Sequence, residues 1–421
     1  AFYGTFYNCS LLESGVTSDL FRYNTKVTTN AFYNTFYGCS SLPYIPSGLF
    51  DYNTGVTLSS FYGTFYGCSK ITSIPSNLFD NNTLVTNFDY TFYGCTLIEN
   101  IPNDLFKYNT SVTNFQYTFQ NCSYLLNIPS NLFDTNTGVT TFNSVFSGCV
   151  SLMNIPQDLF KYNVNVTNSA FQNTFYGCAS LMEIPQDLFK YNVNVSSNAF
   201  QGTFQGCSSL MEIPQNLFKY NTGVTSSAFQ ATFSNCSNIR SIPDNLFSGC
   251  TLVSTNGFAS TFSNCYSLEN IPQGLFDTNI NVSIGGFYQT FYNCTNLINL
   301  PIGLFRNNVN VSSNGFYQTF NQCSKLKLNP WIFYLPGEQS TRFLNRVSDF
   351  SFCFYRNGYN GLINDYGMAP DLWNCNFGSQ TPVINNCFGG GYWTYLKNYS
   401  YIPSTWGTNN TVTTSSANQP Q

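Results

Sequence analysis

Hydrophobic residues return along the chain at fixed offsets within a period of 27 to 30 residues. One period runs from Thr203 to Gln230 and reads TFQGCSSLMEIPQNLFKYNTGVTSSAFQ. Its apolar positions are a phenylalanine, a cysteine, a leucine, an isoleucine, a Leu-Phe pair and a valine, separated by polar residues. Self-similarity at such a period indicates stacked supersecondary units, so we expect a solenoid.

Cysteines mark the period most clearly. Their spacing is 29 residues in most intervals, 27 in three and 30 at both ends. Eleven periods carry the Leu-Phe pair, and a twelfth is degenerate around Ile332-Phe333. The sequence therefore predicts about twelve coils. The cysteines of this column are Cys9, Cys39, Cys68, Cys95, Cys122, Cys149, Cys178, Cys207, Cys236, Cys265, Cys294, Cys323 and Cys353.

The spacing within a period predicts short local elements. Phe200 and Phe204 are four residues apart, as on one face of a helix. The residue two positions after the second phenylalanine is glycine or asparagine in most periods, which is typical of a left-handed helix C-cap. A short strand is expected from Leu210 to Ile213, stopped by Pro214. The proline is expected to begin a second helical turn that points the Leu-Phe pair inward.

Asparagine forms a second column, four residues beyond the leucine of each Leu-Phe pair. Its side chain can hydrogen-bond the backbone of the turn and of the next coil, so we expect a buried asparagine ladder. Cys250 takes this position in one period, which suits a small buried residue. The ladder contains Asn24, Asn53, Asn82, Asn109, Asn136, Asn163, Asn192, Asn221, Asn279 and Asn308.

The segment from Thr35 to Thr57, with TFYGCSSL, IPSGLF and NTGVT, resembles the BspA-like leucine-rich repeats of microbial surface proteins. The shared features are a Phe-x-x-Cys-x-x-Leu segment, an Ile-Pro step and a Val-Thr step, over roughly residues 1–330. The C-terminal GMAPDLWNCNFGS resembles tails that follow such repeats in gut-bacterial and phage proteins. We expect an α/β, right-handed leucine-rich-repeat-like solenoid with a C-terminal cap. The chain begins within a period at Ala1, so we also expect a processed or incomplete chain.

Three regions are predicted. Residues 1–323 are expected to form the solenoid, and residues 324–406 a degenerate last repeat and a capping region, which closes the open end of the core. Residues 407–421 are polar and are expected to form a flexible tail.

Composition excludes several classes of function. Charged residues make up 8% of the chain, the net charge is −4 and no basic run exists, which argues against a nucleic-acid partner. No apolar stretch approaches the ~20 residues of a transmembrane segment. Because histidine is absent and the 19 carboxylates are scattered, we predict no enzyme, no catalytic residue and no cofactor.

Metal binding and disulfides are also disfavoured in the cysteine column. The chain has no histidine and no Cys-x-x-Cys pair to form a metal site. Neighbouring coils are expected ~4.8 Å apart, whereas disulfides need Cβ atoms at ~3.8 Å. The column should therefore consist of buried, reduced thiols. Cys375 and Cys387 lie outside it in a glycine-rich segment and are candidates for a local disulfide.

Four sequons share one column, two residues beyond the asparagine ladder. Other periods place lysine, glycine or serine there, which indicates an exposed turn. If the protein passes through a glycosylating pathway, the candidate glycosylation sites are Asn165, Asn194, Asn281 and Asn310.

Aromatic residues outside the core columns are the best indication of function. Tyrosines such as Tyr3, Tyr33, Tyr62, Tyr288 and Tyr317 would suit contact with protein or glycan, or would pack against the adjacent coil. All four tryptophans and several basic residues lie in the last quarter, which forms a cap, a binding head or both. The candidate ligand-binding residues there are Trp373, Trp393, Trp406, Arg342 and Arg346.

The resemblance and the charge-poor, tyrosine-rich surface favour an extracellular protein on a microbial cell or a virion. Its expected role is adhesion to, or recognition of, a protein or glycan on a host or neighbouring cell. The alternative is a structural subunit of an extracellular filament, because repeat edges can support head-to-tail self-association that does not close.

Overall fold

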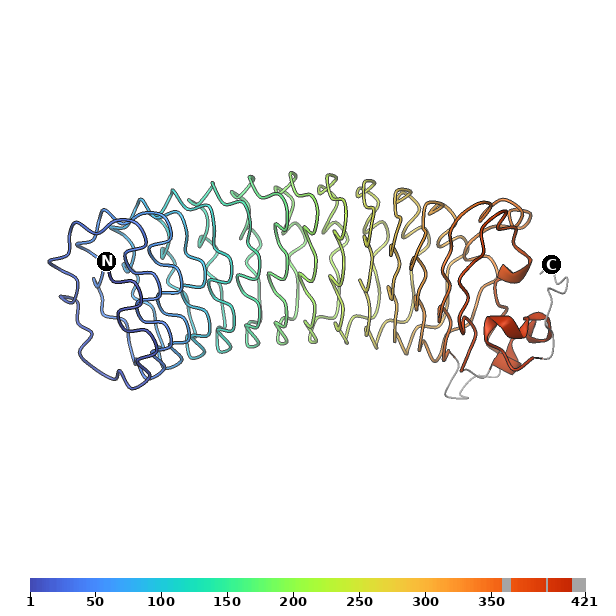
Figure 1. Ribbon diagram of the computed structural model, residues 1–421, viewed down its shortest axis with the longest axis horizontal. Helices are drawn as coiled ribbons and strands as arrows, with labels where there is room; N and C mark the ends of the chain where they lie inside the picture. The colour runs from blue at the N-terminus through green and yellow to red at the C-terminus, as the bar shows by residue number, and fades with distance from the viewer. Residues whose placement is uncertain (358–364, 391–392, 411–421) are drawn as a thin grey trace. The chain divides into compact units, whose positions relative to one another are not determined.

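The computed structural model describes residues 1–357, 365–390 and 393–410 (Figure 1). The chain divides into two compact units, Ala1–Ser209 and Leu210–Gln421. Within each unit, successive coils pair in parallel, as Asn87 does with Asn114 in the first unit and Ser241 with Asn270 in the second. The fold is a leucine-rich-repeat solenoid, as the period predicted.

Little regular secondary structure supports this solenoid. The helices of the described residues are four short 3-10 helices in the second unit: η1 (Leu372–Asn374), η2 (Trp393–Tyr395), η3 (Tyr399–Tyr401) and η4 (Ser404–Trp406). In place of the expected strands, coils pair through single-residue bridges such as Asn270 to Asn299. The segment after Pro214 is likewise a turn, in which the Leu217 N–H donates to the Pro214 carbonyl at 3.3 Å.

The Phe-x-x-Thr-Phe segment was predicted as a short helix, and the structure shows that this prediction is wrong. The segment forms consecutive turns. Its backbone N–H groups alternate between carbonyls of the same coil and carbonyls of the next coil. In the first coil the Thr5 N–H donates to the Phe2 carbonyl at 3.1 Å, and the Phe6 N–H donates to the Thr35 carbonyl of the next coil at 2.8 Å. About half of the N–H groups therefore form hydrogen bonds between neighbouring coils. In an α-helix, the same N–H groups would instead bond carbonyls of the helix itself.

Left-handed backbone positions explain why no helix forms. Asn198, Gly202 and Gly206 have φ of +53°, +60° and +79°, so every fourth residue is left-handed. An α-helix requires negative φ throughout. Gly206 is the third residue of a turn closed by the Cys207 N–H on the Phe204 carbonyl at 3.1 Å, the position at which a type II turn needs positive φ.

Phenylalanines fill the core, with three columns of rings in contact. Phe160 is fully buried, and its ring centroid lies 4.7 Å from that of Phe142 and 4.8 Å from that of Phe171. Leu217 and Phe218 of the Leu-Phe pair are 1% and 0% exposed, which confirms that the pair points inward.

Coil stacking continues beyond residue 323, the predicted end of the solenoid. The Phe320 N–H donates to the Cys353 carbonyl and the Phe354 N–H to the Cys387 carbonyl, both at 2.9 Å. The same pattern therefore extends into the region predicted as a degenerate repeat and cap. The predicted tail falls largely outside the described residues, although Thr408 is buried and its hydroxyl donates to the Ile402 carbonyl.

Candidate functional site

Three columns of polar side chains join neighbouring coils. In each column the side chain donates to the carbonyl of a phenylalanine in the preceding coil, and that carbonyl also accepts a turn N–H of its own coil. Both acceptor positions of the carbonyl are thereby used. The columns are therefore structural. One set comprises Thr64 to Phe32 at 2.9 Å, Cys68 to Phe36 at 3.1 Å and Asn82 to Phe50 at 3.2 Å.

The asparagine ladder is buried, as predicted, except for Asn24 in the first coil, which is exposed. The buried side chains use the nitrogen of the amide as a donor. Asn82 Nδ2 also donates to the Asn53 carbonyl at 3.1 Å, while its Oδ1 has no hydrogen-bond partner among the described residues. The position therefore requires a donor and no acceptor. This requirement accounts for Cys250, whose Sγ lies 3.7 Å and 3.8 Å from the carbonyls of Phe218 and Asn221.

Replacing Asn192 by leucine is expected to lower the free energy of unfolding by about 1–3 kcal/mol. Asn192 Nδ2 donates to the buried carbonyls of Phe160 and Asn163 at 3.1 and 3.0 Å, and leucine cannot replace these bonds. The matched control is Asn194→Leu in the same coil. Asn194 is exposed and bonds one carbonyl, that of Val164, so a change within about 0.5 kcal/mol is expected. Urea denaturation measures both variants. An equal loss of unfolding free energy in Asn192→Leu and Asn194→Leu would show that the buried ladder position contributes no more stability than the exposed one.

The cysteines are free thiols, and all except Cys9 are buried. Burial raises the pKa of Cys178 to about 12 and that of Cys149 well above its usual range, so these thiols stay protonated at neutral pH. Cys375 and Cys387 are also buried free thiols with different surroundings. Cys375 donates to the Asp371 carbonyl, and neither thiol is paired, so the predicted disulfide is not formed in this structure.

Cys9 is expected to be the one cysteine that reacts readily with iodoacetamide in the native protein. The other fifteen of the 16 thiols are buried, and reaction requires an accessible thiolate. Mass spectrometry of peptides alkylated before and after unfolding measures this. Ready native labelling of the buried column, or disulfide-linked column peptides, would contradict the structure.

Two of the tryptophans proposed as ligand contacts lie in the interior. Trp373 is 8% exposed and Trp406 is 4% exposed, and the Trp406 ring lies 6.3 Å from that of Phe350. This burial favours the capping role over direct ligand contact. Trp393 begins η2, and its side chain lies outside what the structure describes.

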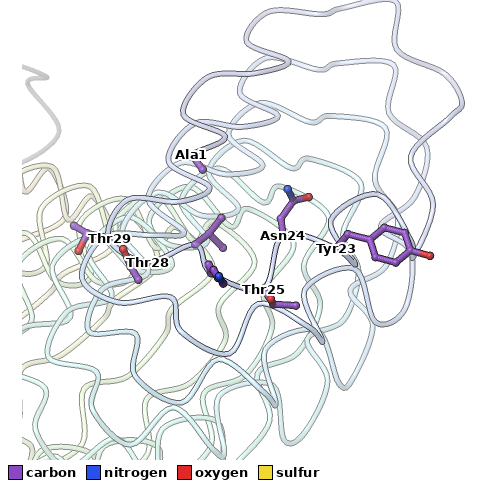
Figure 2. A pocket seen from close by; sticks show the side chains of 8 residues that line it. Ala1, Tyr23, Asn24, Thr25, Thr28 and Thr29 are labelled. Atoms are coloured by element: carbon purple, nitrogen blue, oxygen red, sulfur yellow. The ribbon is translucent and has the colours of Figure 1, made fainter.

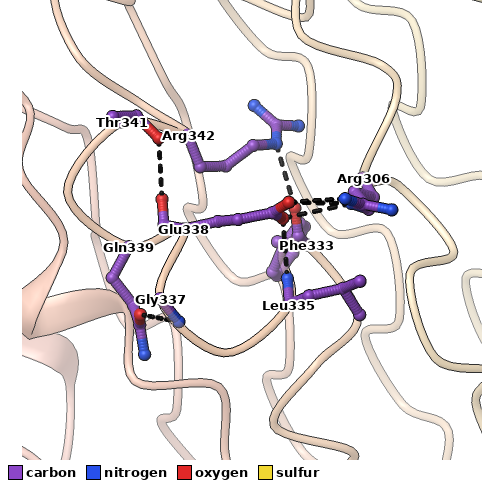
Figure 3. Close-up of polar contacts among 8 residues, drawn as sticks. All are labelled: Arg306, Phe333, Leu335, Gly337, Glu338, Gln339, Thr341 and Arg342. Carbon is purple, nitrogen blue, oxygen red and sulfur yellow. Dashed lines mark hydrogen bonds and ion pairs between the residues drawn. The ribbon is translucent and has the colours of Figure 1, made fainter.

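Arg342 is also buried, because it continues the asparagine ladder. Its Nη2 donates to the carbonyls of Phe305 and Asn308 at 3.0 and 3.2 Å, the bonds that a ladder asparagine would make. Its Nε donates to the Phe333 carbonyl at 2.9 Å (Figure 3). Burial, and secondarily the charge of Arg346, lower the pKa of Arg342 to about 10, so the guanidinium stays charged at neutral pH.

A cavity of about 470 Å³ adjoins Arg342 in the second unit, and we call it the arginine pocket. Glu338 accepts hydrogen bonds from Arg306 Nη2 at 2.6 Å and Nε at 3.1 Å (Figure 3), and these bonds lower its pKa. Arg346 is partly exposed, and its Nη1 donates to the Val309 carbonyl. The side chains of Ile280, Asn307, Val309 and Thr341 complete the lining. The pocket thus combines a net positive charge with two aliphatic side chains.

Two further pockets offer less specific chemistry. One of about 430 Å³ in the first unit is lined by Tyr23, Asn24, Lys26 and several threonines (Figure 2). Another of about 380 Å³ in the second unit is lined by Lys327, Lys397 and mainly uncharged residues. Neither gathers several arginines.

Stacked tyrosines cover one surface of the first unit. In one column, Tyr37 and Tyr66 lie 4.2 Å apart and Tyr66 and Tyr93 lie 4.3 Å apart, with ring planes within 8°. In the neighbouring column, Tyr33 and Tyr62 lie 4.5 Å apart. All of these rings are partly exposed. We call the group the tyrosine surface; it comprises Tyr3, Tyr7, Tyr33, Tyr37, Tyr62, Tyr66, Tyr90, Tyr93 and Tyr117.

The structure confirms that these surface tyrosines pack against the adjacent coil, and their rings still face solvent. Contact with a protein or glycan stays a prediction. Tyr288 and Tyr317 stack in the same way in the second unit, at 5.1 Å. Sequence reasoning did not single out Tyr37, Tyr66 and Tyr93, which each lie two residues before a cysteine of the column. Their fixed offset from the cysteine column could have identified them.

The four candidate glycosylation sites are exposed, as the shared column predicted. Each donates its Nδ2 to a backbone carbonyl of the preceding coil at 2.9 to 3.0 Å. The sites are Asn165, Asn194, Asn281 and Asn310, and their modification stays a prediction.

The described residues form neither a metal site nor a membrane-spanning helix. No three histidine, cysteine, aspartate or glutamate side chains among residues 1–357, 365–390 and 393–410 are grouped to hold a metal ion. In the same described part of the chain, no helix is both long enough and apolar enough to cross a membrane.

No protein-family model and no curated protein matches this chain. Among solved structures, it is similar to a leucine-rich cell surface protein from Faecalibacterium prausnitzii, with 18% identity, 81% of each chain covered and a TM-score of 0.32. A leucine-rich repeat protein from Bacteroides ovatus is 21% identical over 63% of this chain and 86% of that chain, with a TM-score of 0.25. The functional domain of InlJ from Listeria monocytogenes, which includes a cysteine ladder, is 12% identical over 72% of this chain and 66% of that chain, with a TM-score of 0.32. Functional inference therefore rests on the geometry of this chain.

Proposed function

We propose that this chain is a non-enzymatic repeat protein of an extracellular, cell or virion surface, which recognises a protein or glycan on a host or neighbouring cell. The observation that carries the proposal is the tyrosine surface of the first unit. Tyr37, Tyr66 and Tyr93 form a continuous stack with partly exposed rings. Tyrosine supplies large contact area together with a hydrogen-bonding hydroxyl, which suits recognition of protein and glycan alike.

The coil core does not need these tyrosines. Fully buried phenylalanines such as Phe36, Phe65 and Phe92 already fill the interior of the same coils. The tyrosine rings are instead held parallel at the surface, which lowers the conformational entropy lost on binding. Burial, and secondarily the neighbouring Tyr117, raise the pKa of Tyr90 to about 12. Like any tyrosine hydroxyl at neutral pH, its hydroxyl is protonated and able to donate.

The proposal is tested by replacing two tyrosines at the centre of the surface. The Tyr37→Ala/Tyr66→Ala variant is expected to reduce binding of the labelled protein to target cells or arrayed glycans by about 30-fold or more, since a single interface anchor contributes ~2 kcal/mol or more. The matched control is Tyr162→Ala/Tyr191→Ala, which removes two exposed tyrosines outside this surface.

Thermal unfolding of both variants must accompany the binding assay. Unchanged binding by a folded Tyr37→Ala/Tyr66→Ala variant would contradict recognition through this surface. Negative-stain electron microscopy of the purified chain addresses the alternative: regular filaments, together with no binding to cells or glycans, would favour a structural subunit.

A further inference from the structure

We propose that the arginine pocket binds the carboxylate of an acidic sugar residue. This inference rests on the proposed function, because it names a ligand class for the same recognition protein. It concerns the second unit, and it stands on different residues from the tyrosine surface.

The first argument is the charge of Arg342. Its guanidinium side chain is 7% exposed, and its bonds go to the neutral backbone carbonyls of Phe305, Asn308 and Phe333. None of the ion pairs between described residues includes Arg342. A buried charge without a paired counter-ion is unfavourable. An anion bound in the adjoining cavity would reduce that cost.

No carboxylate among the described residues forms an ion pair with Arg342. Glu338 is held by Arg306 through three contacts of 2.6 to 3.1 Å. Asp277 also acts on Arg306. The charge of Glu338 also acts on Arg342, although the two side chains form no ion pair. Arg342 and Arg346 both lack an ion-pair partner among the described side chains. The pocket retains positive charge next to a free volume.

Arg346 provides the binding edge. Its Nη1 donates to the Val309 carbonyl, and no hydrogen bond in the described part of the chain involves its Nε or Nη2. These two groups form the planar edge of a guanidinium that pairs with a carboxylate through two parallel hydrogen bonds. Because Arg342 lines the same pocket, this edge is suited to a single monovalent anion.

The rest of the lining favours a sugar as the carrier of that anion. Ile280 and Val309 offer an aliphatic surface to the C–H face of a pyranose, and Asn307 and Thr341 offer polar groups to its hydroxyls. A volume of about 470 Å³ accommodates a monosaccharide and lies within the range of small-molecule sites. Glu338 would repel a second negative charge, which disfavours phosphate monoesters.

The test is isothermal titration of the full chain with methyl β-D-glucuronide, methyl β-D-glucoside and acetate. The two glycosides differ in the carboxylate alone. We expect the glucuronide to bind about tenfold or more tightly than the glucoside, and acetate to bind more weakly than the glucuronide. Arg346→Gln should weaken glucuronide binding about tenfold, and Arg346→Lys less. Lys327→Gln, outside the pocket, is the matched control.

Glu338→Gln distinguishes a ligand site from a loss of folding. Removing this carboxylate frees Arg306 and should strengthen glucuronide binding several-fold, whereas a disrupted pocket could only weaken it. Equal binding of both glycosides, acetate binding as tight as the glucuronide, or full affinity in Arg346→Gln would each overturn the inference. The Tyr37→Ala/Tyr66→Ala variant should bind glucuronide normally, so failure of this site is separable from failure of the tyrosine surface.

Discussion

Replacing Phe160 by alanine is expected to lower the free energy of unfolding of the first unit by about 3–5 kcal/mol. The ring is fully buried and contacts rings on both neighbouring coils, with centroid distances of 4.7 Å to Phe142, 4.8 Å to Phe171 and 6.3 Å to Phe189. Alanine would leave a cavity that a stack of rings, fixed by coil-to-coil hydrogen bonds, cannot close. Urea denaturation followed by circular dichroism measures the loss.

The controls for this prediction separate cavity formation from general sensitivity. Phe160→Leu keeps much of the volume and should cost distinctly less than alanine. Tyr162→Ala, at an exposed position of the same coil, should change stability by about 0.5 kcal/mol or less. A loss below about 1 kcal/mol for Phe160→Ala would contradict a close-packed phenylalanine core.

Asp89→Asn is expected to stabilise the first unit increasingly as the pH rises from 4 to 8. Asp89 is 8% exposed; its Oδ2 accepts from Asn87 Nδ2 and Asn114 Nδ2 at 3.0 Å each, and its Oδ1 has no partner among the described residues. Burial raises the pKa of Asp89 from 3.8 to about 7. The folded state therefore prefers the protonated acid.

The sign of the pH dependence follows from this raised pKa. The stability contributed by Asp89 is fully present below pH 3.8 and is lost as the pH rises through about 7. The loss reaches as much as about 4 kcal/mol at pH 8, because each pKa unit corresponds to about 1.4 kcal/mol. Asparagine stays neutral and removes this dependence. The control is Asp104→Asn, at an exposed carboxylate.

Unfolding midpoints of wild type and both variants at pH 4, 6 and 8 provide the comparison. A difference between wild type and Asp89→Asn that stays constant over this range would show that folding does not raise the pKa of Asp89, which would contradict the prediction.

The solenoid and its buried ladders could be predicted from the sequence, because a residue type that recurs at the same offset in each period indicates the same structural environment in each coil. A cysteine or asparagine that returns at the same offset must occupy an equivalent site in every coil, as Cys68 and Asn82 do. The local backbone conformation was harder to predict from the sequence. The four-residue spacing of Phe200 and Phe204 fits a helical face and also fits two successive turns. Gly202, four residues before Gly206, was the available indication that left-handed positions repeat.

The C-terminal region could not be predicted equally well because it breaks the repeat. Without an offset to compare, Arg342 and Trp406 were assigned by residue type as ligand contacts, whereas packing buries both. Arg342 occupies the next position of the asparagine ladder, because this position requires only a hydrogen-bond donor. The requirement becomes visible only when the positions of the Phe305 and Asn308 carbonyls are known. The partners of Glu338 likewise depend on tertiary structure.

Hydroxyl-radical footprinting of tyrosine side chains, on the chain free and bound to target cells, tests whether the tyrosine surface is the recognition surface. We predict that oxidation of Tyr33, Tyr37 and Tyr66, which are partly exposed in the free chain, falls about tenfold on binding, because a partner excludes solvent from the centre of its interface. Oxidation of the exposed Tyr162 and Tyr191 should not change. Unaltered oxidation of the tyrosine surface in the bound chain, with protection elsewhere, would contradict the account.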